Sequence, residues 1–506
     1  MDPRFNTQAG IYEILEQADA VPGVLDIRIG RWLAWPAVKN FIYARLCNAL
    51  ADEPIASPQA RRVFTGASLL SRLPLTWRRL RSELAKLPAS SARPRVAWLS
   101  GAYARRGSDG TERDAIFGDL PAQLTPHVEQ LWFQPPVITE GASGIHAETV
   151  YEIATALGNE LTSLQRFRPA VLNAARVLAE KLTAVTPTVA GLTWHRACLD
   201  ALSMFEARRM AWNVVFADTK PAVVLLTNAP YLSGEVAAAK ASGAVVAEFQ
   251  HGLFGPRCPE YGWPGSLASQ RDAMAVADRL YVFGDLFRGG ALKNAFWRAD
   301  DVRVIGSADI ERLRHQPEPA AVLSDHPRIV FLTQPMTRSD AIAFWDDFLN
   351  GIASGQYPKA SLTIKVHPSE RHVTAEYAVL ASRHPGLCTV AGADEDASRL
   401  MIEHDLVVSY TSYALIEAVG LGRNAVSISG EQAPGGVFAL CPIPGAGDAI
   451  PTVSSPSELA ALAARAGRAT TTAAANGFFA PQAPGTLLQA TLDLLRASGH
   501  AVPAEG

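Results

Sequence analysis

Two histidines that each follow a short apolar segment are the first residues of this sequence that could do chemistry. His251 stands in Gln-His-Gly after the segment 244–249, and His367 stands in His-Pro after the segment 361–366. In open α/β sheets, ligands bind at the carboxyl ends of parallel strands. If both segments are strands of such sheets, both imidazoles lie where a ligand would bind. For His251 taken alone, a structural and a catalytic role are equally open.

Proline fixes the path of the chain directly after His367. The run Lys-Val-His-Pro begins inside the predicted strand, and Pro368 restricts the backbone while removing one hydrogen-bond donor. An imidazole or an ammonium group held there can neutralise a phosphate. The alternative is an ordinary turn with an exposed histidine, because His-Pro also occurs at two other places. The preceding strand favours a phosphate site formed by Lys365, His367 and Pro368.

A cluster of hydroxyl residues follows a third apolar segment, 406–409. Thr411 and Ser412 stand between this segment and a predicted helix, and Glu417 lies one to two turns inside that helix. Backbone amides and the positive end of the helix dipole together bind phosphate. Ordinary capping explains one hydroxyl at such a place but not a cluster that also includes Ser409. We therefore expect a phosphate site at Thr411 and Ser412.

Several common sites are disfavoured by the sequence. The acidic run 394–396 has a spacing that can hold a metal ion, but it precedes a predicted helix at 397–403, where carboxylates complement the helix dipole. We therefore expect no metal site there. The phosphate-loop, nucleophile-elbow and dinucleotide-binding glycine patterns are all absent, which argues against an NTPase, a serine hydrolase and a dehydrogenase.

Composition narrows the class of protein further. The 506 residues carry a formal net charge of -3, which argues against a nucleic-acid partner, and 48% are hydrophobic, which argues against disorder. No uncharged apolar run reaches the roughly 18 residues that span a bilayer. Five scattered cysteines without a Cys-x-x-Cys pair suit a reducing compartment. We expect a large cytoplasmic protein, most simply an enzyme.

The elements that would position these residues form two sets. From residue 95 onward, apolar segments alternate with alanine-rich stretches of helical spacing, which is typical of parallel βαβ units. The predicted strands are 96–101, 128–133, 222–227, 244–249, 279–283 and 302–305 in the first set, and 328–332, 361–366, 387–390, 406–409 and 425–428 in the second. The polar, proline-containing stretch 308–326 is expected to connect the sets. We predict an α/β fold with two Rossmann-like domains that face each other across a cleft.

The predicted boundaries add two smaller parts to this pair of domains. The four predicted parts are a helical, basic N-terminal region at 1–90, the Rossmann-like domains at 91–315 and 316–485, and a C-terminal helix and tail at 486–506. The late helix is expected to pack back across the domain interface. In 61–88, arginines alternate with leucines. This stretch favours either a helix whose apolar side joins the core or, by its charge, attachment to an anionic inner-membrane surface.

Taken in order, these segments resemble bacterial glycosyltransferases of the GT-B fold that build surface polysaccharides. The likeness covers 221–422, and its elements are Gln-His-Gly at 250–252, Tyr-Val-Phe-Gly at 281–284, Val-Ile-Gly-Ser at 304–307, Lys-x-His-Pro at 365–368 and Thr-Ser at 411–412 ahead of Glu417. The His-Pro and Ser/Thr elements are similar to those of bacterial sialyltransferases and Kdo transferases, which use CMP-activated sugars. The Gln-His-Gly element is similar to that of CDP-glycerol glycerophosphotransferases.

The resemblance implies roles for individual residues and requires no metal or other cofactor. His367, Thr411 and Ser412 would hold the nucleotide phosphate, Glu417 would hold the ribose, and Lys365 would add charge. The remaining residues that it assigns to the donor site are Pro368, Gly306 and Ser307. The catalytic base would be an acid of an acidic-acidic-Gly loop, and Ser-Asp-Gly at 108–110 is the nearest match. This favours Asp109 as the base, with Asp114, Glu235 and His251 as rivals.

The function expected from this resemblance is an inverting, metal-independent glycosyl transfer. A CMP-activated sugar, Kdo or a sialic-acid-like sugar, would be moved onto a lipopolysaccharide or capsule glycan, free or lipid-linked. The alternatives are a UDP-sugar transferase or UDP-sugar epimerase of the same fold, or a non-catalytic subunit that binds a nucleotide sugar. In these expectations the domain 91–315 holds the acceptor and the domain 316–485 holds the nucleotide sugar.

Overall fold

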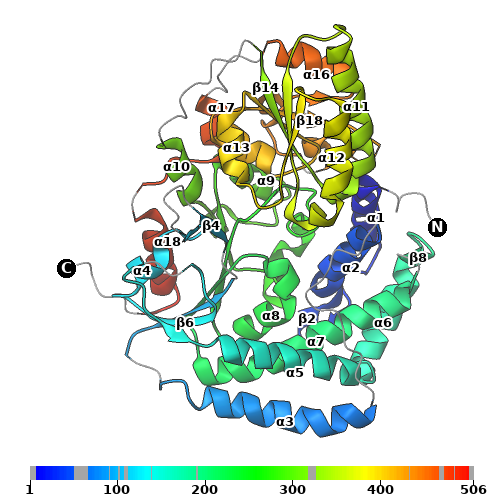
Figure 1. Ribbon diagram of the computed structural model, residues 1–506. Coiled ribbons are helices and arrows are strands. Elements are labelled where there is room, and N and C mark those ends of the chain that lie inside the picture. The colour runs from blue at the N-terminus through cyan, green and yellow to red at the C-terminus, as the bar shows by residue number, and fades with distance from the viewer. Residues whose placement is uncertain are drawn as a thin grey trace.

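The computed structural model describes most of the chain. The described residues are 7–50, 66–89, 92–100, 103–106, 112–137, 140–189, 192–316, 326–431, 433–440, 442–465, 472–483 and 485–500. Two parallel sheets with helices on both faces dominate the structure, one in the lower and one in the upper part of Figure 1. This is the predicted α/β fold with two Rossmann-like domains.

The first sheet has seven strands, in the order β13-β12-β11-β10-β3-β6-β7, and every neighbouring pair is parallel. Its strands are β3 (Arg95–Leu99), β6 (Glu129–Gln134), β7 (Ile145–His146), β10 (Val223–Leu226), β11 (Val245–Phe249), β12 (Arg279–Val282) and β13 (Val302–Val304). All six strands predicted for the first set are present. β7 was not predicted, because two residues are too short to form a recognisable apolar segment.

The second sheet has six parallel strands, in the order β16-β15-β14-β17-β18-β19. Its strands are β14 (Arg328–Leu332), β15 (Ser361–Lys365), β16 (Cys388–Ala391), β17 (Leu406–Ser409), β18 (Asn424–Ile428) and β19 (Thr452–Val453). The five predicted strands are confirmed, and only the two-residue β19 is new. Strands buried on both faces are continuously apolar, which is why they could be recognised.

Helices cover both faces of the first sheet. The helices up to this sheet's last strand are α1 (Gln8–Ala20), α2 (Ala34–Leu50), α3 (Gly66–Leu84), α4 (Leu120–Leu124), α5 (Glu148–Gln165), α6 (Pro169–Leu182), α7 (Trp194–Thr219), α8 (Ser233–Ala241) and α9 (Asp285–Leu292). One face packs on α5, α7 and α8. The opposite face packs on α4 and on α18 (Thr486–Ala497), the last helix of the chain.

The C-terminal helix therefore returns to the first domain, as predicted. The Tyr281 hydroxyl of β12 donates to the carbonyl of Ala490 at 3.0 Å, and Arg303 pairs with Asp493 at 2.8 Å. The helices of the second half are α10 (Ala308–Arg314), α11 (Arg338–Ala353), α12 (Thr374–Arg383), α13 (Ala397–Glu403), α14 (Ala414–Gly420), α15 (Val437–Leu440), α16 (Pro456–Ala463) and α17 (Thr472–Phe478), besides α18. Asp396 caps α13 by accepting from the amide of Ser398 at 2.9 Å, as expected for the acidic run before it.

A shared apolar core joins the two domains. It contains Phe283 and Phe287 of the first domain, Leu415 and Ile416 of the second, and Phe479 just after α17. The rings of Phe283 and Phe479 stack with centroids 5.6 Å apart. Burying these apolar side chains stabilises the contact between the domains.

The predicted interdomain connection, 308–326, begins with a helix. Residues 308–314 form α10, whose cap is Ser307, and 317–325 lie outside the described residues. The stretch is rich in polar residues, but Ile310 and Leu313 lie three positions apart on one face and are buried. The helix matters for the site because it begins at the carboxyl end of the first sheet.

The N-terminal helices pack on the first domain. α1 and α2, with the short hairpin of β1 (Arg28–Ile29) and β2 (Trp32–Leu33), share a core with α6 and α7 and lie beside α8 in Figure 1. α3 lies along the lower edge of the molecule, with Leu80 and Leu84 buried and Arg78, Arg79 and Arg81 exposed. The apolar side of this helix therefore joins the core. Two further hairpins pair β4 (Ala104–Arg106) with β5 (Glu112–Asp114) and β8 (Thr188–Val189) with β9 (Leu192–Thr193).

Candidate functional site

A cavity of about 340 Å³ lies between the two domains, at the carboxyl ends of both sheets. Its lining includes the predicted residues His251, His367, Thr411 and Ser412. The remaining lining residues are Tyr12, Tyr43, Asn228, Tyr231, Gly252, Leu253, Cys258, Glu260, Tyr261, Gln334, Pro335 and Tyr413. The structure thus brings together residues that are up to 161 positions apart in the sequence and that were predicted from three separate motifs.

Gln334 fixes the hydroxyl cluster of the second domain. It follows β14, and its Oε1 accepts from the amide of Thr411 at 2.8 Å while its Nε2 donates to Thr411 Oγ1 at 3.2 Å. Ser409 Oγ donates to the carbonyl of Leu332 at 2.8 Å, which ties β17 to β14. Ser412 Oγ accepts from the amide of Ala414 at 3.2 Å. The cluster is therefore a rigid turn between the ends of two adjacent strands.

A buried carboxyl group holds the His-Pro turn. The amide of His367 donates to Thr333 Oγ1 at 2.8 Å, and the Thr333 hydroxyl donates to Glu370 Oε2 at 2.5 Å. Tyr377 also donates to Glu370, at 3.2 Å. Burial raises the pKa of Glu370 above its ordinary range, although both hydroxyl donors oppose this shift. Thr333 and Glu370 thus position His367 without lining the cavity themselves.

The imidazole of His367 is exposed at the cavity wall. Its Nδ1 accepts from the amide of Ser369 at 3.2 Å, so in the neutral ring the proton lies on Nε2. Burial, and secondarily the charge of Lys365, lowers the pKa of His367. A neutral imidazole with an Nε2 donor, or a cation once an anion is bound, can both hydrogen-bond a phosphate oxygen.

His251 forms the opposing wall from the first domain. Burial lowers the pKa of His251 to about 4, and its Nδ1 has no hydrogen-bond partner among the described residues. The neighbouring Gln250 accepts from the amide of Phe283 at 2.9 Å and so locks the ends of β11 and β12 together. The ring of Tyr103 lies beside His251, with centroids 6.2 Å apart. His251 is therefore a neutral, half-buried imidazole at the cavity wall between the domains.

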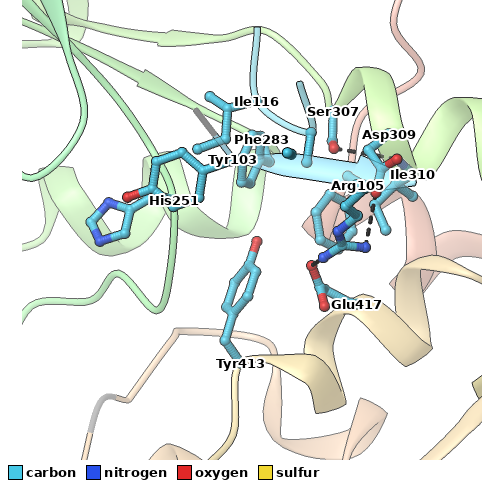
Figure 2. Close-up of a pocket in the computed structure, with 13 residues that line it drawn as sticks. Tyr103, Arg105, Ile116, His251, Phe283, Ser307, Asp309, Ile310, Tyr413 and Glu417 are labelled. Atoms are coloured by element: carbon cyan, nitrogen blue, oxygen red, sulfur yellow. Dashed lines mark hydrogen bonds and ion pairs between the residues drawn. The ribbon is translucent and has the colours of Figure 1, made fainter. Parts of the chain in front are cut away.

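A smaller cavity of about 160 Å³ adjoins the larger one, with His251 and Tyr413 in the lining of both. Figure 2 shows Arg105 of β4 between Glu417 of α14 and Asp309 of α10. The guanidinium lies 2.6 Å from Glu417 and 2.9 Å from Asp309. Glu417 mainly, together with Asp309, raises the pKa of Arg105 above its ordinary value. Glu417, expected to face a ribose, is thus held in an ion pair between the domains.

Three residues predicted for the donor site have other surroundings. Lys365 Nζ donates to the carbonyls of Val366 and Ala393 at 2.7 and 3.1 Å and lines neither cavity. Gly306 has φ +72°, and a Cβ there would lie 2.6 Å from the carbonyl oxygen of Ala480. Pro368 also lines neither cavity. Lys365 therefore donates to nearby backbone carbonyls. Gly306 leaves room for the backbone of the segment that precedes α18.

Ser307 and the rival bases also have defined places. Ser307 lines the smaller cavity and caps α10 by accepting from the amide of Ile310 at 3.4 Å. Asp114 accepts from the amides of Ile116 and Phe117 at 2.9 and 3.0 Å, so it shapes its own loop. Glu235 is buried 3.8 Å from Arg208 and lines neither cavity, and burial raises its pKa. Asp109 lies outside the described residues.

Sequence reasoning missed the residues that neighbouring loops and helices bring to the site. Tyr103 and Arg105 come from the β4–β5 hairpin, and Glu260 comes from the loop after β11. Tyr12 and Tyr43 come from the N-terminal helices. None of these five lies within three residues of the end of a strand in either main sheet, so the strand-end rule could not select them. Of the five, only Glu260 lies close in sequence to a predicted motif, because it follows Gln-His-Gly by eight residues.

Comparison with known proteins gave matches only among solved structures. No family model matches the sequence, and no curated protein matches it. The UDP-GlcNAc 2-epimerase from Methanocaldococcus jannaschii aligns with 13% identity and a TM-score of 0.41, over 57% of this chain and 82% of that one. A glycosyltransferase from Rickettsia africae aligns with 12% identity and a TM-score of 0.41, over 80% of this chain and 98% of that one. MurG from Acinetobacter baumannii aligns with 14% identity and a TM-score of 0.37, over 58% of this chain and 80% of that one.

No residue role or substrate is carried over from these likenesses. Two parallel α/β domains that face each other across a cleft constitute the GT-B fold, and the sheets and the cavity between them show this arrangement directly. The predicted fold class is therefore confirmed. In the part of the chain that the structure describes, no helix combines the length and the apolar character needed to cross a bilayer.

Proposed function

We propose that this protein is an inverting, metal-independent glycosyltransferase that uses a nucleotide-activated sugar. The observation that carries the proposal is the convergence of His367, Thr411 and Ser412 with His251 in one interdomain cavity. An imidazole and two hydroxyls on a rigid backbone are donors suited to a nucleotide phosphate. A leaving phosphate gains negative charge as the sugar departs, so donors already in position lower the barrier without further reorganisation.

The donor is a CMP-activated sugar in this proposal, and the acceptor is a lipopolysaccharide or capsule glycan. The choice of CMP rests on the likeness of the Lys-x-His-Pro and Ser/Thr elements to those of sialyltransferases and Kdo transferases. Glu417 would contact the ribose from the smaller cavity, where Arg105 holds it. The base that receives the acceptor proton would be Asp109 by the resemblance, with His251 as the rival that lines the cavity.

The experiment is a nucleotide-release assay with CMP-sialic acid, CMP-Kdo and UDP-GlcNAc as donors. His367→Ala should lower turnover of the preferred donor by about 10²-fold or more, since one oxyanion donor is typically worth 10²–10³. His372→Ala is the matched control, because His372 lies in the same short helix (Pro368–Val373) but outside both cavities. Equal turnover in wild type and His367→Ala, with both folded, would refute the assignment.

The alternatives predict different products in the same assay. A UDP-sugar transferase releases UDP only. A UDP-sugar epimerase converts the donor without any acceptor, which product analysis by NMR detects. A non-catalytic subunit binds a nucleotide sugar and releases nothing from any donor.

A location on the inner-membrane surface belongs to the same proposal. The exposed Arg78, Arg79 and Arg81 of α3 form a basic surface that anionic lipids could attract. Replacing these three arginines with glutamine should abolish sedimentation with anionic liposomes. Unchanged sedimentation would leave α3 with a packing role alone.

A further inference from the structure

The half of the larger cavity away from the phosphate residues is lined by tyrosines and one carboxylate. Tyr12 and Tyr43 come from α1 and α2, Tyr231 from the short helix Ala229–Leu232, and Glu260 and Tyr261 from the loop after β11. Three segments that are far apart in the sequence therefore build one wall. The N-terminal helices also contact the loop that carries Glu260, where Glu16 of α1 pairs with Arg257 at 2.6 Å.

Glu260 is the one acidic side chain among the described residues that line this cavity. Its Oε1 accepts from the Tyr231 hydroxyl at 3.0 Å, and its Oε2 accepts from Cys258 Sγ at 2.9 Å. Within the described part of the chain, no lysine, arginine or histidine lies within ion-pair distance of it. A carboxylate offers about four acceptor positions, so two neutral donors leave capacity for a ligand hydroxyl.

The other carboxylates near the cleft are already engaged. Asp309 and Glu417 share Arg105, and Glu235 lies against Arg208 outside the cavity. Glu248 is buried behind the wall, where it accepts from the amide of Ala229 at 3.0 Å and from the Tyr261 hydroxyl at 2.7 Å. Of the carboxylates compared, Glu260 alone is both unpaired with a cation and in contact with the cavity.

We propose that Glu260, in place of Asp109 or His251, is the general base of the transfer and that Tyr12, Tyr43, Tyr231 and Tyr261 enclose the subsite for a sugar acceptor. This inference rests on the proposed function. The acceptor oxygen bonds to the anomeric carbon of the donor while its proton passes to Glu260. The bond from that carbon to the phosphate oxygen breaks at the same time, and its electron pair leaves with the nucleotide. Glu260 then returns the proton to water.

The rival base inside the cavity, His251, would become a cation in a desolvated place on receiving this proton, and burial lowers its pKa to about 4. Glu260 would instead become neutral on receiving it. His251 is suited to orient a ligand between the domains. Tyrosines suit the acceptor side because each combines a flat apolar ring with a hydroxyl that hydrogen-bonds a polyol.

Glu260→Gln tests this role because it keeps the shape of the side chain and removes its basicity. Nucleotide release from CMP-sialic acid, CMP-Kdo and UDP-GlcNAc is measured with water alone and with methyl glucoside, galactoside and mannoside as acceptors. Release should fall 10²–10⁴-fold in this variant. The control is Glu16→Gln, the same chemical change at a residue that contacts the same loop but lines neither cavity. It should retain wild-type release.

A second variant separates chemistry from folding. Glu260→Ala should melt within a few degrees of wild type and regain release when formate is added, since formate supplies a mobile carboxylate. Wild-type release in Glu260→Gln would overturn the assignment of Glu260 and leave the proposed function standing. No release by the wild-type protein from any of the three donors would instead overturn the proposed function, and this inference with it.

Discussion

The two walls of the larger cavity differ in how the chain builds them. The second-domain wall includes Gln334, His367 and Thr411, each of which closely follows a parallel strand. The amide of His367 donates to Thr333, and the amide of Thr411 donates to Gln334, so hydrogen bonds to the backbone fix all three. The opposite wall contains Glu260 and tyrosines from loops and from the N-terminal helices. The sheet fixes the positions of strand ends, so any chain with this fold places residues at the second-domain wall. The opposite wall is formed by loops and added helices, whose sequence and length the fold does not fix.

Under the proposed function, this difference favours different ligands for the two walls. A nucleotide is the part of an activated sugar that varies least, and it suits a wall made of strand ends. An acceptor glycan varies widely, and it suits a wall made of loops and of an added helical region. The predictions below test each wall and the link between them.

The link between the domains should give the largest effect on stability. Arg105→Ala removes the cation that Asp309 and Glu417 share and should lower the free energy of unfolding by about 2–3 kcal/mol, measured by urea denaturation. Arg312→Ala is the control, because the ion pair that Arg312 forms among the described residues is with Asp309, three residues earlier in the same helix. It should cost less than about 1 kcal/mol. Equal losses in the two variants would contradict a special role for the interdomain pair.

The support of the second-domain wall should give an intermediate effect. Thr333→Val keeps the side-chain shape but removes the acceptor of the His367 amide and a donor to the buried Glu370. We expect a loss of about 1–3 kcal/mol in stability. Turnover should fall as well, because the turn that carries His367 loosens. A variant with lowered stability and unchanged turnover would show that His367 does not depend on this turn.

The support of the wall that contains Glu260 should affect stability in a pH-dependent way, and only above acidic pH. Burial raises the pKa of Glu248 to about 8, so this carboxyl group is protonated in the folded protein at pH 7. Between pH 4.5 and pH 8 the unfolded chain releases this proton while the folded protein keeps it. Stability therefore falls as the pH rises through this window, by at most about 1.4 kcal/mol per pH unit for one proton.

Glu248→Gln removes this titration and keeps an oxygen that accepts from Ala229 and Tyr261. The difference in unfolding free energy between variant and wild type, measured by urea denaturation, should shift in favour of the variant from pH 5 to pH 8. A difference that stays constant over this range would show that Glu248 is ionised in the folded protein.

The strands and the strand-end residues that line the larger cavity could be predicted from the sequence for one physical reason. Strands covered on both faces are continuously apolar, and the first polar side chains after them necessarily lie at the ligand edge of the sheet. His251, His367, Thr411 and Ser412 were identified in this way. Lys365, predicted to add charge to the donor site, donates to the carbonyls of Val366 and Ala393 and lines neither cavity.

The residues of the opposite wall could not be predicted by the same reasoning. The place of Tyr12 and Tyr43 depends on how α1 and α2 pack against the first domain, which a local pattern does not contain. Arg105 and Glu417 are 312 positions apart, and neither follows a strand of the two main sheets directly. The helix α10 was hidden because its few apolar residues lie among charged ones.

Nucleotide binding tests most directly whether the two domains form one nucleotide-sugar site. The melting temperature of the wild-type protein and of His367→Ala is measured with CMP, CDP, UDP and GDP. Since a ligand at 100 times its Kd stabilises the native state by about 2.7 kcal/mol, CMP should raise the melting temperature of the wild type by several degrees and that of His367→Ala far less. No shift with any of the four nucleotides would contradict the proposed site, and a shift with UDP alone would assign the donor to the UDP-sugars.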